Sequence, residues 1–471
     1  MEKKISPLLF VSIALSSCAS IPDLGGVSKI ATPADYKADK NFENLPQKGW
    51  PKEQWWQNYQ DPQLNNLIEE GLENSPNLAQ ARARLLNAQG IVRTAGGALY
   101  PSISLDATVF GNKQTYHNGM PKAFALKGTH YNSLAEVNFA YELDFFEKNN
   151  KAFQSALAFE KASHYDLAQA ALLVGISIAT TYSDLAKLYK HLEAAKEALV
   201  VRQKTADLFR LRTAKGLENE GTLEGSLSLV QTAQADLNAI EESIELAKLQ
   251  LVLLMGKGPD RALTIQEPKI FDQDFGLPAE LSSELLLRKP DLAAAKARVF
   301  SSFLKIDVSK ANFYPSVNLL FSAGRQSLDA GDFFKTGAGI ASFGPSFTLP
   351  IFNTKALQGS YIQARADYET ATAIYNETLL KALNDVAGVL VKHKKVTQRL
   401  KHVEAAFAAS KKAYKVINER YKAGVTNYLE VLRAEDSLIL NRRALADVKS
   451  QAFTNDVELV KALGGGFKLN S

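Results

Sequence analysis

The sequence predicts a mixed α and β protein in which long helices and four short strands recur in two similar halves. Three observations predict it: long proline-free stretches carry a coiled-coil repeat, short segments alternate apolar and polar residues, and several motifs return at a constant offset. With 46% hydrophobic and 22% charged residues among 471, the composition is that of a folded protein. The net charge of +5 gives no reason to expect a nucleic-acid partner.

The amino terminus has the features of an export signal over residues 1–17. Lys3 and Lys4 precede an apolar stretch from Ile5 to Leu15, which is too short to span a bilayer. The stretch ends in Leu-Ser-Ser-Cys, which resembles the lipobox of bacterial lipoproteins, so we expect Cys18 to be acylated after cleavage. The alternative is that Cys18 is only a small apolar residue within a cleaved signal. By the same resemblance Ala19 favours the outer membrane, and residues 18–60 are then a lipid-anchored extension.

Long helices are predicted where proline is absent, because an interior proline costs a helix roughly 3 kcal/mol. No proline lies between Pro121 and Pro259, and none follows Pro350. Apolar residues spaced alternately by four and three run along both stretches, as in a coiled coil. They are Leu237, Ile240, Ile244, Ala247, Leu251 and Leu254 in the first, and Leu357, Tyr361, Ala364, Tyr368, Ala371 and Tyr375 in the second. From Lys355 to Ala423 a continuous helix would be on the order of 100 Å long.

The two halves are predicted to be copies. Ser75-Pro76-Asn77-Leu78 returns as Lys289-Pro290-Asp291-Leu292 at an offset of 214, as does the Tyr-Pro-Ser motif that begins at Tyr100. Towards the end of each half the offset is 208, at Gly216 and Gly424 and again at Gly256 and Gly464. We therefore predict a first repeat over 61–256, a connector over 257–289, a second repeat over 290–463 and a tail over 464–471.

Each repeat is predicted to contain two strands, because apolar and polar residues alternate with a period of two. The strands are expected at about 102–111, 134–143, 316–324 and 340–350. Strands of about 9 to 11 residues with one apolar face are typical of a membrane β-barrel, although a half-exposed sheet of a soluble domain shows the same alternation. No continuous apolar run of about 18 residues occurs in the mature chain, so a membrane crossing would have to use strands.

Four strands cannot close a transmembrane barrel, whose smallest known form has about eight. An open sheet edge in lipid would leave backbone groups without hydrogen-bond partners. Several copies of the chain would therefore have to share one barrel. About eight strands from two copies leave an interior filled by side chains, whereas about twelve from three copies leave room for a lumen.

Five motifs resemble the outer-membrane efflux protein family, the TolC-like channels, and most closely its lipoprotein branch. They begin at Trp55-Trp56, Tyr141-Glu142-Leu143-Asp144, Gly344-Pro345-Ser346, Arg420-Tyr421-Lys422-Ala423-Gly424 and Lys461-Ala462-Leu463. The resemblance implies a homotrimer, with four strands per chain in a 12-stranded transmembrane β-barrel and a long periplasmic α-helical barrel. It also implies a passive outer-membrane conduit for small molecules, supplied by an inner-membrane pump through a periplasmic adaptor. Within the same architecture, a protein-secretion channel is the alternative.

The resemblance also implies two kinds of site. Hairpin tips at Gly216 and Gly424 would dock the adaptor, although ordinary helix stops explain the same glycines. A periplasmic gate would use Leu429, Arg433 and Asp436, whose order of charges is reversed relative to the family. We expect Arg433 and Asp436 to tie neighbouring copies together; a solvated pair on one helix is the alternative.

Three further positions depart from the family or from strand chemistry. Glu147 stands where the family has glycine, and Asn353-Thr354 replaces a glycine-rich turn. Pro345 lacks an N–H, so we expect a bulge or a sheet edge there.

An enzyme is not expected. The six histidines show no metal-ligand spacing, and Cys18 is the only cysteine, so we predict no metal, no cofactor and no intramolecular disulfide. Gly464-Gly465-Gly466 follows a helix and lies in the wrong context for a dinucleotide-binding loop. From a different class, a periplasmic coiled-coil scaffold that forms no pore is the competing hypothesis.

Overall fold

A computed structural model describes residues 20–36, 53–115, 117, 121, 124, 127–270, 289–351 and 353–468. The signal peptide 1–17, Cys18 and residues 271–288 of the predicted connector lie outside these residues. The chain divides into two compact units. Unit 1 comprises Met1–Lys29, Leu86–Ala162 and Ala295–Ile374, and unit 2 comprises Ile30–Leu85, Ser163–Ala294 and Tyr375–Ser471.

The order of elements repeats within the chain, in agreement with the predicted duplication. The first series is α3 (Pro76–Gly97), β1 (Ser102–Lys113), β2 (Thr129–Leu143), α4 (Lys148–Ala214) and α5 (Glu220–Met255). The second is α6 (Pro290–Ala311), β3 (Ser316–Ser327), β4 (Gly339–Thr348), α7 (Thr354–Lys422) and α8 (Tyr428–Ala462). Short additional elements are η1 (Pro33–Tyr36), η3 (Trp55–Tyr59), α2 (Pro62–Asn74), η4 (Pro259–Thr264) and η7 (Ala330–Asp332).

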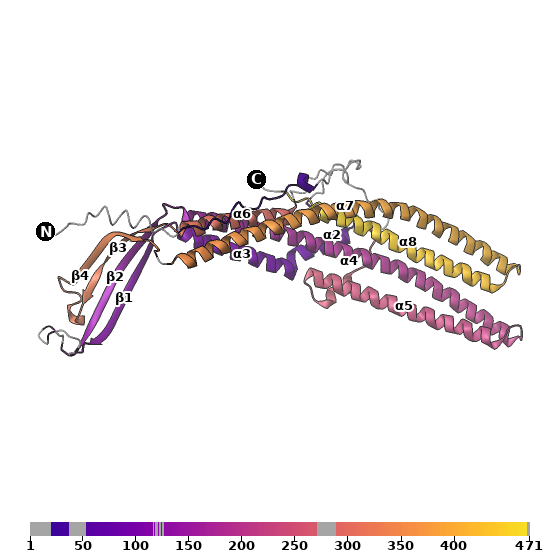
Figure 1. The fold of residues 1–471 in the computed structure, drawn as a ribbon. Helices are drawn as coiled ribbons and strands as arrows, with labels where there is room; N and C mark the ends of the chain where they lie inside the picture. The colour runs from indigo at the N-terminus through magenta and orange to yellow at the C-terminus, as the bar shows by residue number, and fades with distance from the viewer. Residues whose placement is uncertain are drawn as a thin grey trace. The chain divides into compact units, whose positions relative to one another are not determined.

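The four strands of unit 1 form one antiparallel sheet in the order β1-β2-β3-β4, so β1 and β4 are its edges (Figure 1). The prediction of four strands is confirmed. The register of β3 with β4 is one to one from Ser316 opposite Thr348 to Arg325 opposite Gly339, so Pro345 causes no bulge. Instead it lies on an edge strand, where a missing N–H is tolerated.

The sheet exposes apolar side chains. Ile103, Leu105 and Val109 on β1 are about 70% exposed, and Phe343 on β4 is 87% exposed. Single exposed apolar residues are ordinary, but a row of them on alternate positions forms a continuous apolar face. Such a face requires lipid or another protein surface to cover it.

The turn from β2 into α4 depends on Glu147, which adopts a left-handed φ of +56°. This conformation explains why glycine is usual at the position, since only glycine adopts it without steric cost. Asp144 caps α4, because its carboxylate accepts the N–H groups of Asn149 and Asn150 at 3.1 and 2.8 Å. Lys151 forms an ion pair with Glu147 at 3.2 Å.

Small residues bring α4 and α6 close together in unit 1. The hydroxyl of Ser155 donates to the backbone carbonyl of Ser301, and the hydroxyl of Ser301 donates to the backbone carbonyl of Ser155, both at 2.9 Å. Both residues are buried, so the reciprocal hydrogen bonds satisfy polar groups that would otherwise be unpaired.

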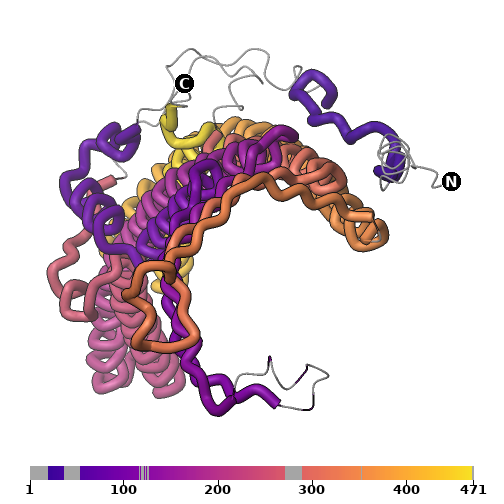
Figure 2. Tube along the Cα trace, turned by 90° about the vertical axis from the view of Figure 1, so that its left-hand side faces the viewer, coloured from indigo at the N-terminus to yellow at the C-terminus, as the bar shows by residue number. Residues whose placement is uncertain are grey.

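In unit 2, α4 lies beside α5 and forms the first hairpin with it (Figures 1 and 2). The second hairpin consists of α7 and α8. The predicted helical stretches are confirmed: α4 has 67 residues and α7 has 69, which corresponds to roughly 100 Å each. Most of the predicted coiled-coil positions are buried, among them Leu251 of α5 at 0% exposure and Tyr375 of α7 at 2%, and the others are half-buried.

The core of unit 2 contains the tryptophan motif. Trp55 and Trp56 are buried beside Tyr59, whose ring lies 4.7 Å from that of Phe453 on α8. The Tyr59 hydroxyl donates to the Asp456 carboxylate at 2.6 Å. The amino-terminal extension therefore contributes to the same core as the last helix.

One described helix, α4, contains a stretch that is apolar enough to cross a membrane by length and composition. Of that stretch 56% is buried within the chain, as expected for a core helix. The sequence prediction that no such helix exists was too broad, because α4 mixes apolar with uncharged polar residues and forms no continuous apolar run.

Candidate functional site

The turn between α4 and α5 is closed by a glycine and an asparagine. Gly216 has a φ of +70°, and the next N–H, of Leu217, donates to the carbonyl of Arg212 at 2.9 Å. This is the Schellman arrangement, in which a left-handed glycine ends a helix. Asn219 then caps α5 by accepting the N–H of Thr222 at 2.9 Å.

The turn between α7 and α8 has the same construction, and the two turns lie at the same end of the unit 2 helices (Figure 1). Gly424 has a φ of +73°, and the N–H of Val425 donates to the carbonyl of Arg420 at 2.9 Å. Asn427 accepts the N–H of Glu430 at 3.1 Å. Helix termination alone accounts for both glycines, so adaptor docking at Gly216 and Gly424 stays a prediction.

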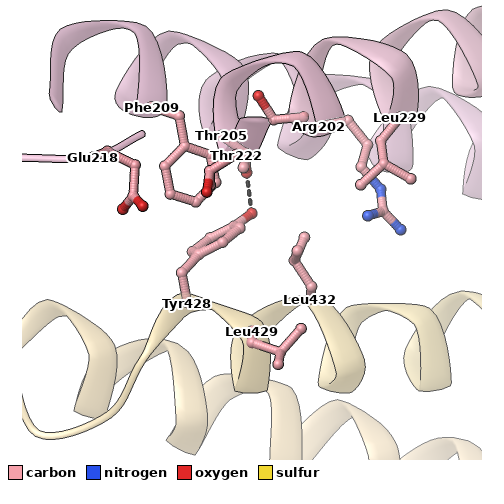
Figure 3. A pocket seen from close by; sticks show the side chains of 11 residues that line it. Arg202, Thr205, Phe209, Glu218, Thr222, Leu229, Tyr428, Leu429 and Leu432 are labelled. Atoms are coloured by element: carbon pink, nitrogen blue, oxygen red, sulfur yellow. Dashed lines mark hydrogen bonds between the residues drawn. The ribbon is translucent and has the colours of Figure 1, made fainter. Parts of the chain in front are cut away.

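Close to these turns, a cavity of about 530 Å³ lies between α8 and the first hairpin. Figure 3 shows Tyr428 of α8 reaching Thr205 of α4, to which its hydroxyl is hydrogen-bonded. The Tyr428 ring also meets Phe209 edge to face, with 5.3 Å between ring centroids. Leu429 and Leu432 line the α8 side of the cavity. Tyr428 thus has its ring in the apolar lining of the cavity, and its hydroxyl forms a hydrogen bond between the two hairpins.

Burial raises the pKa of Tyr428 to about 12. Its hydroxyl is therefore protonated at neutral pH and available as a neutral hydrogen-bond donor. Loss of Thr205 would leave the partly buried Tyr428 hydroxyl without this bond, which typically costs about 1–3 kcal/mol, whereas the Thr205 hydroxyl also donates to the carbonyl of Val201 at 2.9 Å.

About two turns beyond Tyr428 on α8, Asp436 forms an ion pair with Arg202 of α4. The Arg202 side chain is 11% exposed, whereas that of Asp436 is 62% exposed. Arg433 instead pairs with Glu430 on its own helix at 3.2 Å and is 67% exposed. Arg433 and Asp436 thus each have another partner within the chain, and their predicted contacts with neighbouring copies stay a prediction.

Glu435 lies beside this ion pair and is 3% exposed. Neither of its carboxylate oxygens has a hydrogen-bond partner among the described residues. Burial raises the pKa of the Glu435 carboxyl to about 7; the charge of Arg202 opposes the rise, and that of Asp436 adds to it. A buried carboxyl without a partner is stable chiefly in its neutral form.

Further polar contacts join α4 to α8 beyond this point. Arg442 pairs with both Glu193 and Glu197 of α4. The hydroxyls of Ser183 and Ser450 lie 3.0 Å apart, and both residues are buried. The contacts run along the two helices, and among these ion pairs Arg202–Asp436 lies nearest the turns.

Sequence reasoning singled out Leu429 and Asp436, whose role stays a prediction, and did not single out Arg202, Thr205, Tyr428 or Glu435, which the structure places around them. A signal existed for Glu435, because it follows the buried Val431 by four residues and so falls on the apolar stripe of α8. No comparable signal marks Arg202, whose partner is 234 residues away in the chain. Among the described residues, no group of three or more histidine, cysteine, aspartate or glutamate side chains could hold a metal ion.

Comparison with known proteins gives a consistent result. The model of a family described as outer membrane efflux protein matches residues 67–257 and 281–465. The chain is 30% identical to the fusaric acid resistance protein FusA of Burkholderia cepacia, covering 76% of this chain and 68% of FusA. It is 25% identical to the multidrug resistance outer membrane protein MdtP of Escherichia coli (strain K12), covering 99% and 98%. The crystal structure of the outer membrane protein VceC from Vibrio cholerae matches with a TM-score of 0.81 and 37% identity, covering 89% of this chain and 100% of VceC.

Proposed function

Because this chain belongs to the outer membrane efflux protein family and is an outer-membrane channel component of efflux, we propose that three copies form one passive conduit from the periplasm to the exterior. Each copy contributes its four strands to a 12-stranded barrel. The cargo is a class of small organic molecules, in keeping with relatives named for resistance to fusaric acid and to multiple drugs. An inner-membrane pump, acting through a periplasmic adaptor, supplies the energy.

The observation that carries the trimeric barrel is the open sheet of unit 1. Among the described residues, its edges β1 and β4 pair with no further strand, and its apolar face, with Phe343 at 87% exposure, is uncovered. In hydrocarbon each unpaired backbone group would cost several kcal/mol. Pairing β1 of one copy with β4 of the next removes both edges and directs the apolar face to lipid.

The gate of this conduit lies where α8 meets α4. The Arg202–Asp436 ion pair and the Thr205–Tyr428 hydrogen bond hold the second hairpin against the first, with Leu429 on the adjoining surface. Opening then requires these contacts to break. Arg433 can reach a neighbouring copy, because its one partner among the described residues is Glu430, in an exposed pair.

The tips and the amino terminus supply the remaining contacts. The adaptor docks at the turns containing Gly216 and Gly424, where the space beside both glycines is open. Acylated Cys18 anchors the chain to the outer membrane.

The conduit is tested by adding purified protein to a planar lipid bilayer. Discrete single-channel conductance is expected, together with a trimer in detergent by light scattering. A monomer that gives no conductance would establish a periplasmic scaffold instead.

The gate is tested by exchanging charges. Arg202→Asp and Asp436→Arg should each raise the open probability, and the double variant should restore closure, because the pair is re-formed with reversed polarity. Charge reversal of Arg433, alone and combined with that of Asp436, tests the contact between copies. If none of these variants changes conductance, these residues do not form the gate.

A further inference from the structure

Glu435 is a buried acid beside an ion pair that already has both of its members. It is 3% exposed, neither carboxylate oxygen has a partner among the described residues, and the adjacent Arg202 is hydrogen-bonded to Asp436. A charged carboxylate in this position would need a cation. Arg202 is the cation whose attraction acts on Glu435, so two acidic groups compete for one guanidinium.

The groups that face Glu435 come from three helices. They are Arg202 of α4, Tyr414 of α7, and Asp436 and Tyr428 of α8 itself. The pKa values of both tyrosines are raised, chiefly by burial, so both are neutral near pH 7. Arg202 is therefore the positive charge in this set. Whether it pairs with Asp436 or with Glu435 depends on whether Glu435 is ionised.

We propose that Glu435 is a positioning residue of the gate, whose proton determines whether Arg202 holds Asp436. When Glu435 is neutral, Arg202 pairs with Asp436 alone, and this ion pair holds α8 against α4. When Glu435 ionises, it draws the guanidinium towards itself, and Asp436, which is 62% exposed, is released to water. This inference rests on the proposed gate.

The direction of the pH effect follows from linkage. The pKa of Glu435 in the folded protein, about 7, lies above its ordinary value of 4.5. The stabilisation that the neutral Glu435 gives to the closed arrangement is therefore fully present below the ordinary pKa, and it is lost as the pH rises through about 7. The closed arrangement is favoured in acid, and the conduit opens as the side bearing the hairpin tips becomes alkaline.

The experiment measures single-channel open probability while the pH on the tip side is varied from 5.5 to 8.5. In the unchanged protein the ratio of open to closed states should rise from pH 5.5 to about 7, by up to about tenfold per pH unit for each coupled proton, and should level off above the pKa of Glu435 in the closed arrangement. Glu435→Gln should stay mostly closed with a flat profile, because glutamine has no proton to lose. Glu435→Asp should restore a pH dependence, and Glu241→Gln, at an exposed position of α5, should behave like the unchanged protein.

Hydrogen exchange of residues 428–443 at pH 6 and pH 8, corrected for intrinsic rates, provides a readout that does not require conductance. Faster corrected exchange at pH 8 in the unchanged protein, absent in Glu435→Gln, supports the proposal even if no variant conducts; lack of conductance throughout would count against the channel alone. Equal pH profiles for the unchanged protein and Glu435→Gln in both measurements would overturn the role of Glu435 and leave the channel standing.

Discussion

The two helical hairpins of unit 2 have the same turn but different chemistry behind it. Both turns have a left-handed glycine, Gly216 or Gly424, and an asparagine cap three residues later. Behind the turn of the second hairpin lie Arg433, Glu435 and Asp436. At the offset of 208 the first hairpin instead has Gly225, Leu227 and Ser228.

The difference shows that the geometry of the turn does not depend on the ionisable residues behind it. The glycine and the asparagine satisfy the backbone groups of helix ends, a requirement that both copies share. The three ionisable residues on α8 serve no such local need. One of them, Asp436, is instead matched by Arg202 from α4, so the first repeat supplies the countercharge.

The largest effect on stability is expected at the ion pair between Asp436 and the buried Arg202, which has no counterpart in the first hairpin. Asp436→Ala should destabilise the protein by about 1–3 kcal/mol, because Arg202 is 11% exposed and would lose its partner. The matched change Ser228→Ala should stay within about 0.5 kcal/mol, since Ser228 is exposed. Denaturant unfolding in detergent measures both. Equal losses in the two variants would show that the Arg202–Asp436 pair contributes nothing specific.

A smaller and equal effect is expected where the hairpins agree. Gly216→Ala and Gly424→Ala should each cost about 1–2 kcal/mol, because alanine is strained at positive φ even though the space beside both glycines is open. Gly388→Ala, inside α7 and also in open space, should stabilise by roughly 0.5–1 kcal/mol. Thermal unfolding distinguishes the two signs, and a gain at either tip would contradict the turn assignment.

The smallest effect on stability is expected at Arg433, whose pair with Glu430 is exposed. Arg433→Ala should change the free energy of unfolding by at most about 0.5 kcal/mol when measured on dissociated chains. A larger loss that appears only in the assembled protein would reveal a contact with a neighbouring copy. If the free energy of unfolding is unchanged in both states and the conductance is unaltered, Arg433 contacts only solvent and makes no contact with a neighbouring copy.

The sequence predicted the local features of the fold well. The helix expected from Lys355 to Ala423 is observed as Thr354–Lys422, because the absence of proline and the coiled-coil spacing both act along the chain. The second strand begins at Thr129 and not near residue 134. Its first residues are polar and show no alternation, and pairing with β1 extends the strand there.

The site was predicted only in part, and the missing residues share a cause. Leu429 and Asp436 lie in a motif that can be recognised from neighbouring residues, whereas Arg202 becomes relevant only when α4 and α8 are side by side. Glu147 illustrates the same limit, since its departure from glycine was visible but its positive φ was not.

The contact between Tyr59 and Asp456 makes the ancestral halves interdependent. A polypeptide cut within the connector would leave Phe453 and Asp456 on one fragment and the aromatic residues that cover them on the other. We expect neither fragment to fold by itself, because each would expose part of a core that the intact chain buries.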